Sequence, residues 1–131
     1  VDNSWGVDHG SWSVLRRVYP KADVPVFQFS VNASASAREH YETGRKLRAL
    51  RNEGVLIFGS GNVVHNLSRV NWNMDGGYAW AEAFDGYIKR SILEGNDENV
   101  VDYRRAGSSA SHAFHLLDHY APLLYVLGAK D

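Results

Sequence analysis

Residues 54–67 read GVLIFGSGNVVHNL, and this stretch decides the fold that the sequence predicts. Gly54 is suited to closing a helix, and the VLIF run at 55–58 is short, continuous and apolar, which is typical of a central strand covered on both faces. Two glycines and Asn62 follow and lead to His65. The stretch therefore predicts a buried strand whose carboxyl end presents a histidine.

The residues before this stretch predict another strand and a helix. VPVFQFSVN at 24–32 is rich in β-branched and aromatic residues, which favours a strand. Ser36 and Glu39 have capping-box spacing, at the start of a helix that should reach about residue 52. Strand, helix and strand in this order indicate a parallel sheet. We therefore expect an α/β fold in three layers, with a mostly parallel or mixed sheet and helices on both faces, as an incomplete fragment of a larger single domain.

Further helices are expected before and after this unit. Ser11 or Ser13 can cap the first of them, and Asp118 can cap the last. The remaining expected elements are helices over 11–19, 78–95, 97–105 and 119–128 and a flexible loop over 106–111.

Composition limits the classes of function. The 131 residues, 44% of them hydrophobic, suffice for one compact domain with a core. A net charge of −1, from 14 basic and 15 acidic residues, gives no electrostatic reason to expect nucleic acid or an anionic membrane as a partner. No apolar run is long enough to span a membrane, and no signal peptide is apparent, so we expect a cytoplasmic protein that acts on small molecules or proteins. Cysteine is absent, so any metal site must use nitrogen and oxygen ligands.

Three chemistries compete for the loop that ends at His65. A phosphate loop is poorly supported, because the GSG sequence lacks a third glycine and a nearby lysine. A serine nucleophile is excluded, because the GxSxG spacing is missing. The remaining chemistry uses His65 as a metal ligand or as an acid–base group, with Asn62 as polar support.

Other histidines extend this set of candidates. His9 lies in WGVDHGSW, where Asp8 can orient its imidazole, and His119 lies in LDHYAPLLYVLGA. His40, on a polar helix face, is expected to be an ordinary surface residue.

Three blocks of the chain together carry a family resemblance. WGVDHGSWSVLRRVYPKADVPVFQFSVN, GRKLRALRNEGVLIFGSGNVVHNL and HYAPLLYVLGA resemble the class III extradiol dioxygenases of the LigB superfamily, specifically the 4,5-DOPA extradiol dioxygenase group. The resemblance weakens between residues 71 and 118. Family members are roughly twice as long, and their amino-terminal half contributes two metal-binding histidines. The resemblance thus implies that residues 1–131 form the carboxy-terminal part of an extradiol dioxygenase catalytic domain.

The family's activity implies roles for four residues. Family members cleave a catechol ring beside its hydroxyls by inserting both atoms of O2 at a non-haem Fe(II) centre, and zinc is sometimes the bound metal. By this resemblance, His119 matches the carboxy-terminal metal ligand, and His65 matches a histidine held at the metal either as an additional ligand or as the acid–base group. His9 matches a catalytic residue that lines the substrate pocket, and Asn62 is a candidate substrate contact.

The segment before the last ligand departs from the family pattern. SHAFHLLDH stands where family members usually have Pro-Glu-His or Pro-Asp-His, so His115 and the Asp118 carboxylate remain alternatives to His119. Because two ligands of the implied centre are missing from these residues, a non-catalytic structural or interaction fragment is a second hypothesis. A zinc-dependent hydrolase is a third, although no HExxH motif is present.

Overall fold

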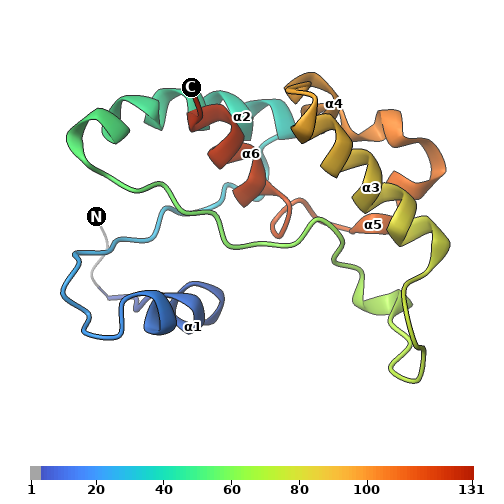
Figure 1. The fold of residues 1–131 in the computed structure, drawn as a ribbon, viewed down its shortest axis with the longest axis horizontal. Helices are drawn as coiled ribbons and strands as arrows, with labels where there is room; N and C mark the ends of the chain where they lie inside the picture. The colour runs from blue at the N-terminus through green and yellow to red at the C-terminus, as the bar shows by residue number, and fades with distance from the viewer. Residues whose placement is uncertain (1–3) are drawn as a thin grey trace. The chain divides into compact units, whose positions relative to one another are not determined.

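The computed structural model describes residues 4–131, which belong to two compact units, one ending at Val31 and one beginning at Asn32 (Figure 1). The first unit contains one helix, α1 (His9–Val18). Asp8 caps it by accepting a hydrogen bond from the Ser11 N–H at 2.8 Å. The cap is therefore an aspartate rather than one of the expected serines, as its carboxylate precedes the free N–H groups of the first turn.

The second unit is built from helices joined by extended segments. The prediction of a capping box is confirmed, since the Ser36 N–H donates to Glu39 Oε2 at 2.7 Å and the Glu39 N–H donates to Ser36 Oγ at 3.3 Å. Its helices, including short 3-10 helices labelled η, are α2 (Ala37–Leu47), η1 (Arg48–Glu53), η2 (Leu67–Arg69), α3 (Ala79–Leu93), α4 (Asp97–Val101), η3 (Tyr103–Ser109), α5 (Ala110–Ala113) and α6 (Ala121–Ala129).

Two expectations about the carboxy-terminal third of the chain were wrong. Residues 106–111 are helical, in η3 and α5, rather than a flexible loop. Asp118 does not cap the last helix, because α6 begins after Tyr120 and has no side-chain cap. Pro122 lies in the first turn of α6, where a missing N–H costs no helical hydrogen bond.

The predicted three-layer α/β fold was also wrong. Residues 25–30 and 55–60 are extended but form no sheet, and the bridge found among residues 4–131 is an isolated parallel one between His65 and Phe114. β-Branched and aromatic residues favour extended backbone, but a strand exists only where its N–H and C=O groups pair with a neighbour. Without that cover, Leu56 is 70% exposed, whereas the flanking Val55 and Ile57 are half-buried.

The core of the second unit is an aromatic cluster beneath α3 and η3. Phe114 packs against Phe84 and Tyr120, with ring centroids 5.9 and 5.1 Å apart respectively. Tyr120 is fully buried, and its hydroxyl donates to the Val100 carbonyl oxygen at 2.8 Å. This bond satisfies a polar group that would otherwise destabilise the core. The cluster therefore anchors the segment between α5 and α6.

Helices α2 and α6 lie side by side and pack closely (Figure 1). His40, expected on the surface, is instead only 1% exposed and faces α6, where its Nδ1 lies 2.9 Å from the Tyr125 hydroxyl. The burial of His40 could not be predicted from the polar residues around it, because one buried side chain does not change the average polarity of a helix face.

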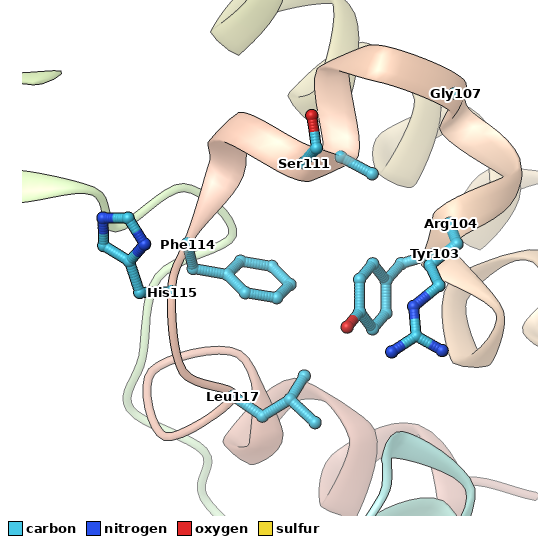
Figure 2. Close-up of a pocket in the computed structure, with 8 residues that line it drawn as sticks. Tyr103, Arg104, Gly107, Ser111, Phe114, His115 and Leu117 are labelled. Carbon is cyan, nitrogen blue, oxygen red and sulfur yellow. The ribbon is translucent and has the colours of Figure 1, made fainter.

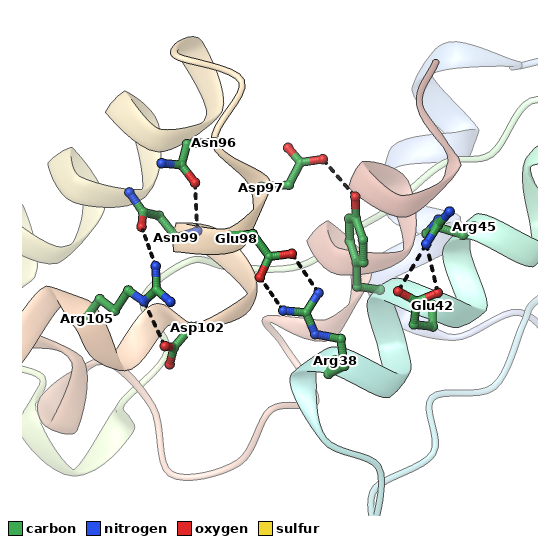
Figure 3. Close-up of polar contacts among 10 residues, drawn as sticks. Arg38, Glu42, Arg45, Asn96, Asp97, Glu98, Asn99, Asp102 and Arg105 are labelled. Carbon is green, nitrogen blue, oxygen red and sulfur yellow. Dashed lines mark hydrogen bonds and ion pairs between the residues drawn. The ribbon is translucent and has the colours of Figure 1, made fainter.

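Polar contacts join α4 to the helices beside it (Figure 3). Arg38 of α2 forms a two-pronged ion pair with Glu98, and the Tyr41 hydroxyl donates to Asp97 at 3.0 Å. Lys130, after α6, also reaches the Asp97 carboxylate. The Arg38–Glu98 pair is exposed and contributes at most about 1 kcal/mol, whereas the contacts of Asp97 are part-buried. Within residues 4–131 we find no helix with the length and hydropathy needed to cross a bilayer.

Candidate functional site

Two of the predicted site histidines lie against one another. The imidazole rings of His65 and His119 are stacked, with centroids 3.5 Å apart and planes inclined by 25°. His65 ends the extended segment that follows η1, and His119 lies in the turn just before α6. The fold thus brings together two nitrogen-bearing side chains from distant parts of the chain.

The glycine loop at 59–62 lies directly on the backbone that carries His119. The Asn62 N–H donates to the His119 carbonyl oxygen at 2.8 Å. A Cβ on Gly61 would lie 2.3 Å from that same oxygen, and one on Gly59 would lie 2.7 Å from the Pro122 oxygen. No side chain fits at such distances, so both positions require glycine. These glycines thus allow a close approach between two backbone segments.

A second backbone contact fixes His65 itself. The His65 N–H donates to the Ala113 carbonyl oxygen at 2.8 Å, within the isolated bridge to Phe114. Because Phe114 belongs to the aromatic core, this contact ties the His65 loop to the most buried part of the unit. The imidazole therefore projects from a backbone anchored by hydrogen bonds at Asn62 and at His65 itself.

The structure separates the alternatives for the last ligand by position. His119, and not His115, stacks on His65; the His119 side chain is 40% exposed, with its Nε2 3.7 Å from the Asp118 carboxylate. His115 is exposed and has its Nε2 3.1 Å from Ser68 Oγ. Of the two histidines, His119 is the one beside His65, and the alternative Asp118 carboxylate lies next to it.

His9 belongs to the first unit and is exposed there. Its ring meets the edge of Trp12, with centroids 5.4 Å apart. The Asp8 carboxylate is engaged by the Ser11 N–H and by the Gln28 side chain. Hydrogen bonding from Ser11 lowers the pKa of Asp8, so this carboxylate is ionised as a helix cap. A role for His9 at the site stays a prediction.

The donor set suits a metal centre but does not complete one. Imidazole is a good ligand for both iron and zinc, and a facial set needs three protein ligands with open positions beside them. Across the described residues, no cluster of three or more histidine, aspartate or glutamate side chains is placed to hold an ion. His65 and His119 therefore fit two positions of a larger set.

A separate pocket of about 350 Å³ lies on the other side of the 112–117 segment. Figure 2 shows the Phe114 ring directed toward Tyr103, with Arg104 and Leu117 nearby and His115 at one edge. Sequence reasoning missed this pocket, because it forms between η3, α5 and the 114–117 segment and no local motif marks it. It does not include the stacked histidines.

Two imidazoles held in this way by backbone contacts are a candidate site for metal or acid–base chemistry. The whole chain, residues 1–131, matches the model of the catalytic LigB subunit of aromatic ring-opening dioxygenase, and the chain belongs to that family.

Relatives with curated names agree with the family. The chain is 47% identical to a 4,5-DOPA dioxygenase extradiol from Escherichia coli (strain K12) and 37% identical to one from Beta vulgaris; each match covers 98% of this chain and 48% of the relative. A crystal structure of an uncharacterized protein from Escherichia coli K12 matches with a TM-score of 0.88 and 44% identity, covering 100% of this chain and 55% of that one. The chain thus spans about half the length of the curated relatives it matches.

Proposed function

We propose that the protein containing this chain opens a catechol-type aromatic ring by extradiol insertion of O2, as a 4,5-DOPA dioxygenase-like enzyme. The observation that carries the proposal is the stacking of His65 on His119, with centroids 3.5 Å apart, in a chain of this family. The reaction partners are a small catechol and O2, and the expected location is the cytoplasm.

The metal in this proposal is Fe(II), with zinc as an alternative bound ion. His65 and His119 would hold it, together with ligands outside the described residues. When bound, such an ion supplies adjacent open positions at which catechol and O2 are brought together.

The chain's own residues prepare and protonate the substrate. Imidazole exchanges protons near neutral pH, so a ring nitrogen of His65 can accept the proton of a catechol hydroxyl and return it as the ring opens. The hydrogen bond from the backbone N–H of His65 to the Ala113 carbonyl oxygen fixes the backbone from which the imidazole projects. Proton transfer by a positioned group typically contributes about 10²–10⁴-fold in rate. Asn62, exposed beside His119, is the proposed polar contact for the substrate.

The direct test uses the full-length gene product loaded with Fe(II) under anaerobic conditions. On addition of L-DOPA or another catechol in air, we expect O2 uptake and the appearance of a yellow semialdehyde. Absence of O2 uptake with every catechol tried would contradict the proposal.

Substitution of single histidines tests the roles of His65, His119 and His115. We expect His65→Gln to reduce turnover by at least about 10²-fold, because glutamine cannot relay a proton. Metal analysis then gives its role: retained metal marks an acid–base group, and lost metal marks a ligand. We expect His119→Gln to lose metal and the matched control His115→Gln to keep it, because only His119 lies beside His65. The opposite result for these two variants would move the ligand to His115.

A non-catalytic role is the second candidate, and it concerns the chain in isolation. The described residues gather no set of three metal ligands. We therefore expect the 131-residue chain alone to bind Fe(II) weakly and to turn over no catechol, in the same assay that detects activity of the full-length protein.

A further inference from the structure

Asn66 is a buried amide directly after His65. Its side chain belongs to a residue only 6% exposed, and its Nδ2 donates to the His112 carbonyl oxygen at 2.7 Å. Its Oδ1 accepts a hydrogen bond from Ser68 Oγ, also at 2.7 Å. Both ends of the amide are therefore used, as a buried polar group requires.

The bond from Asn66 lies next to the backbone bond of His65. The Asn66 side chain binds the carbonyl of residue 112, and the His65 N–H binds the carbonyl of Ala113. Two adjacent donors thus hold two adjacent acceptors, which prevents the 65–66 backbone from both sliding and rotating against the 112–113 segment. The acceptor segment is itself fixed, because Ala113 and Phe114 are part of the buried core.

We propose that Asn66 is a positioning residue that sets the orientation of the His65 imidazole against His119. Its consequence for catalysis rests on the proposed function, whereas its consequence for the His65 backbone does not. The role requires an amide, which donates at one end and accepts at the other. Aspartate has the same shape but no donor, and it would place a carboxylate oxygen about where Nδ2 now lies, against the His112 carbonyl oxygen.

The test compares Asn66→Asp with Asn71→Asp in the full-length protein. Asn71 is exposed, and its side-chain Oδ1 accepts a hydrogen bond from the Asn73 N–H. A carboxylate oxygen can accept the same bond, so aspartate can replace Asn71. We expect hydrogen exchange at the His65 amide to become about tenfold faster or more in Asn66→Asp, with exchange in α3 unchanged. Asn71→Asp should match the wild type at both places.

Kinetics provide a second readout. Disrupting a residue that orients a reacting or metal-binding histidine typically costs about 10–100-fold in activity or metal affinity. We expect kcat of Asn66→Asp to fall within that range while KM for the catechol changes little, since Asn66 is buried and both ends of its amide bind protein groups. If the wild type turns over no catechol but the exchange result holds, the proposed function fails and the positioning role stands.

Two results would overturn the inference. One is an unchanged exchange rate at the His65 amide in Asn66→Asp. The other is an equal increase throughout α2 and α3, which would show that Asn66 only stabilises the fold. If Asn66→Asp does not fold, Ser68→Ala serves instead, because it removes the donor to Asn66 Oδ1 and leaves the Nδ2 bond in place; it also removes the contact with the exposed His115. Faster exchange confined to the His65 region is then expected, and no local change would count against the role.

Discussion

The burial and the pKa of an individual side chain depend on the residues that pack around it. His40 is a clear case, since it is buried between α2 and α6 with its Nδ1 near the Tyr125 hydroxyl. Its Nε2 is buried and has no hydrogen-bond partner among the described residues. Burial lowers the pKa of His40, and the nearby Glu39 charge opposes that shift only in part. The neutral imidazole is therefore the form that fits the folded state.

The pH dependence of stability follows from the lowered pKa of His40. In the unfolded chain the imidazole titrates near its usual 6.5, and in the folded protein it titrates lower. The unfolded state therefore binds more protons below about pH 6.5, so full stability is present above that pH and is lost as the pH falls toward the folded pKa. We expect urea midpoints to decline between pH 7.5 and 5.5 less steeply in His40→Phe than in the wild type. Equal slopes would show that His40 does not contribute.

Helices α2 and α6 approach each other closely at two glycines, Gly44 and Gly128. A Cβ on Gly44 of α2 would lie 2.3 Å from the backbone carbonyl oxygen of Tyr125. A Cβ on Gly128 of α6 would lie 2.1 Å from the backbone carbonyl oxygen of Tyr41. The two helices therefore touch backbone to backbone. Since α6 begins just after His119, this contact also fixes one end of the candidate site.

We expect Gly128→Ala to destabilise the protein by about 1–3 kcal/mol, because the helices must separate to admit a methyl group. Gly86→Ala in α3 is the matched control. A Cβ there meets only the Arg90 guanidinium, at 3.3 Å, and that side chain can move. The control should gain about 0.5–1 kcal/mol from better helix propensity. Free energies of unfolding in urea measure both, and a neutral Gly128→Ala would refute backbone contact between α2 and α6.

On the scale of the whole molecule, one aromatic core supports the site. Phe84, Phe114 and Tyr120 pack together beneath the helices of the second unit. The same Phe114 forms the isolated bridge with His65. Stability of the core and geometry of the candidate site are therefore coupled through one segment.

We expect a substitution in this core to lower the stability of the fold and to disturb the geometry of the candidate site together. Phe84 is fully buried, so Phe84→Ala is expected to cost about 3–5 kcal/mol through lost burial and a cavity. Trp72 is an aromatic residue of comparable size that is 87% exposed, and Trp72→Ala should change stability by less than about 0.5 kcal/mol. Chemical denaturation compares the two. Similar losses for both variants would contradict the core as described.

Local sequence determined the local features of this protein. The Ser36–Glu39 capping box, the glycine that ends η1 at Gly54, and the helices at 79–93 and 121–129 all depend on neighbours within a few residues, and all were predicted. His65 and His119 were predicted as site residues chiefly by family resemblance, and the structure places their rings together, while their roles stay a prediction.

Tertiary structure alone decided the features that depend on distant partners. The β-branched and aromatic residues at 24–32 and the continuous apolar run at 55–58 could favour extended backbone but could not supply neighbouring strands, and no sheet forms among the described residues. The burial of His40 against Tyr125 and the hydrogen bond from Asn66 to His112 were equally hidden, because each partner lies far along the chain. Backbone propensity is a local property, whereas pairing, burial and the meeting of two imidazoles are properties of the packed chain.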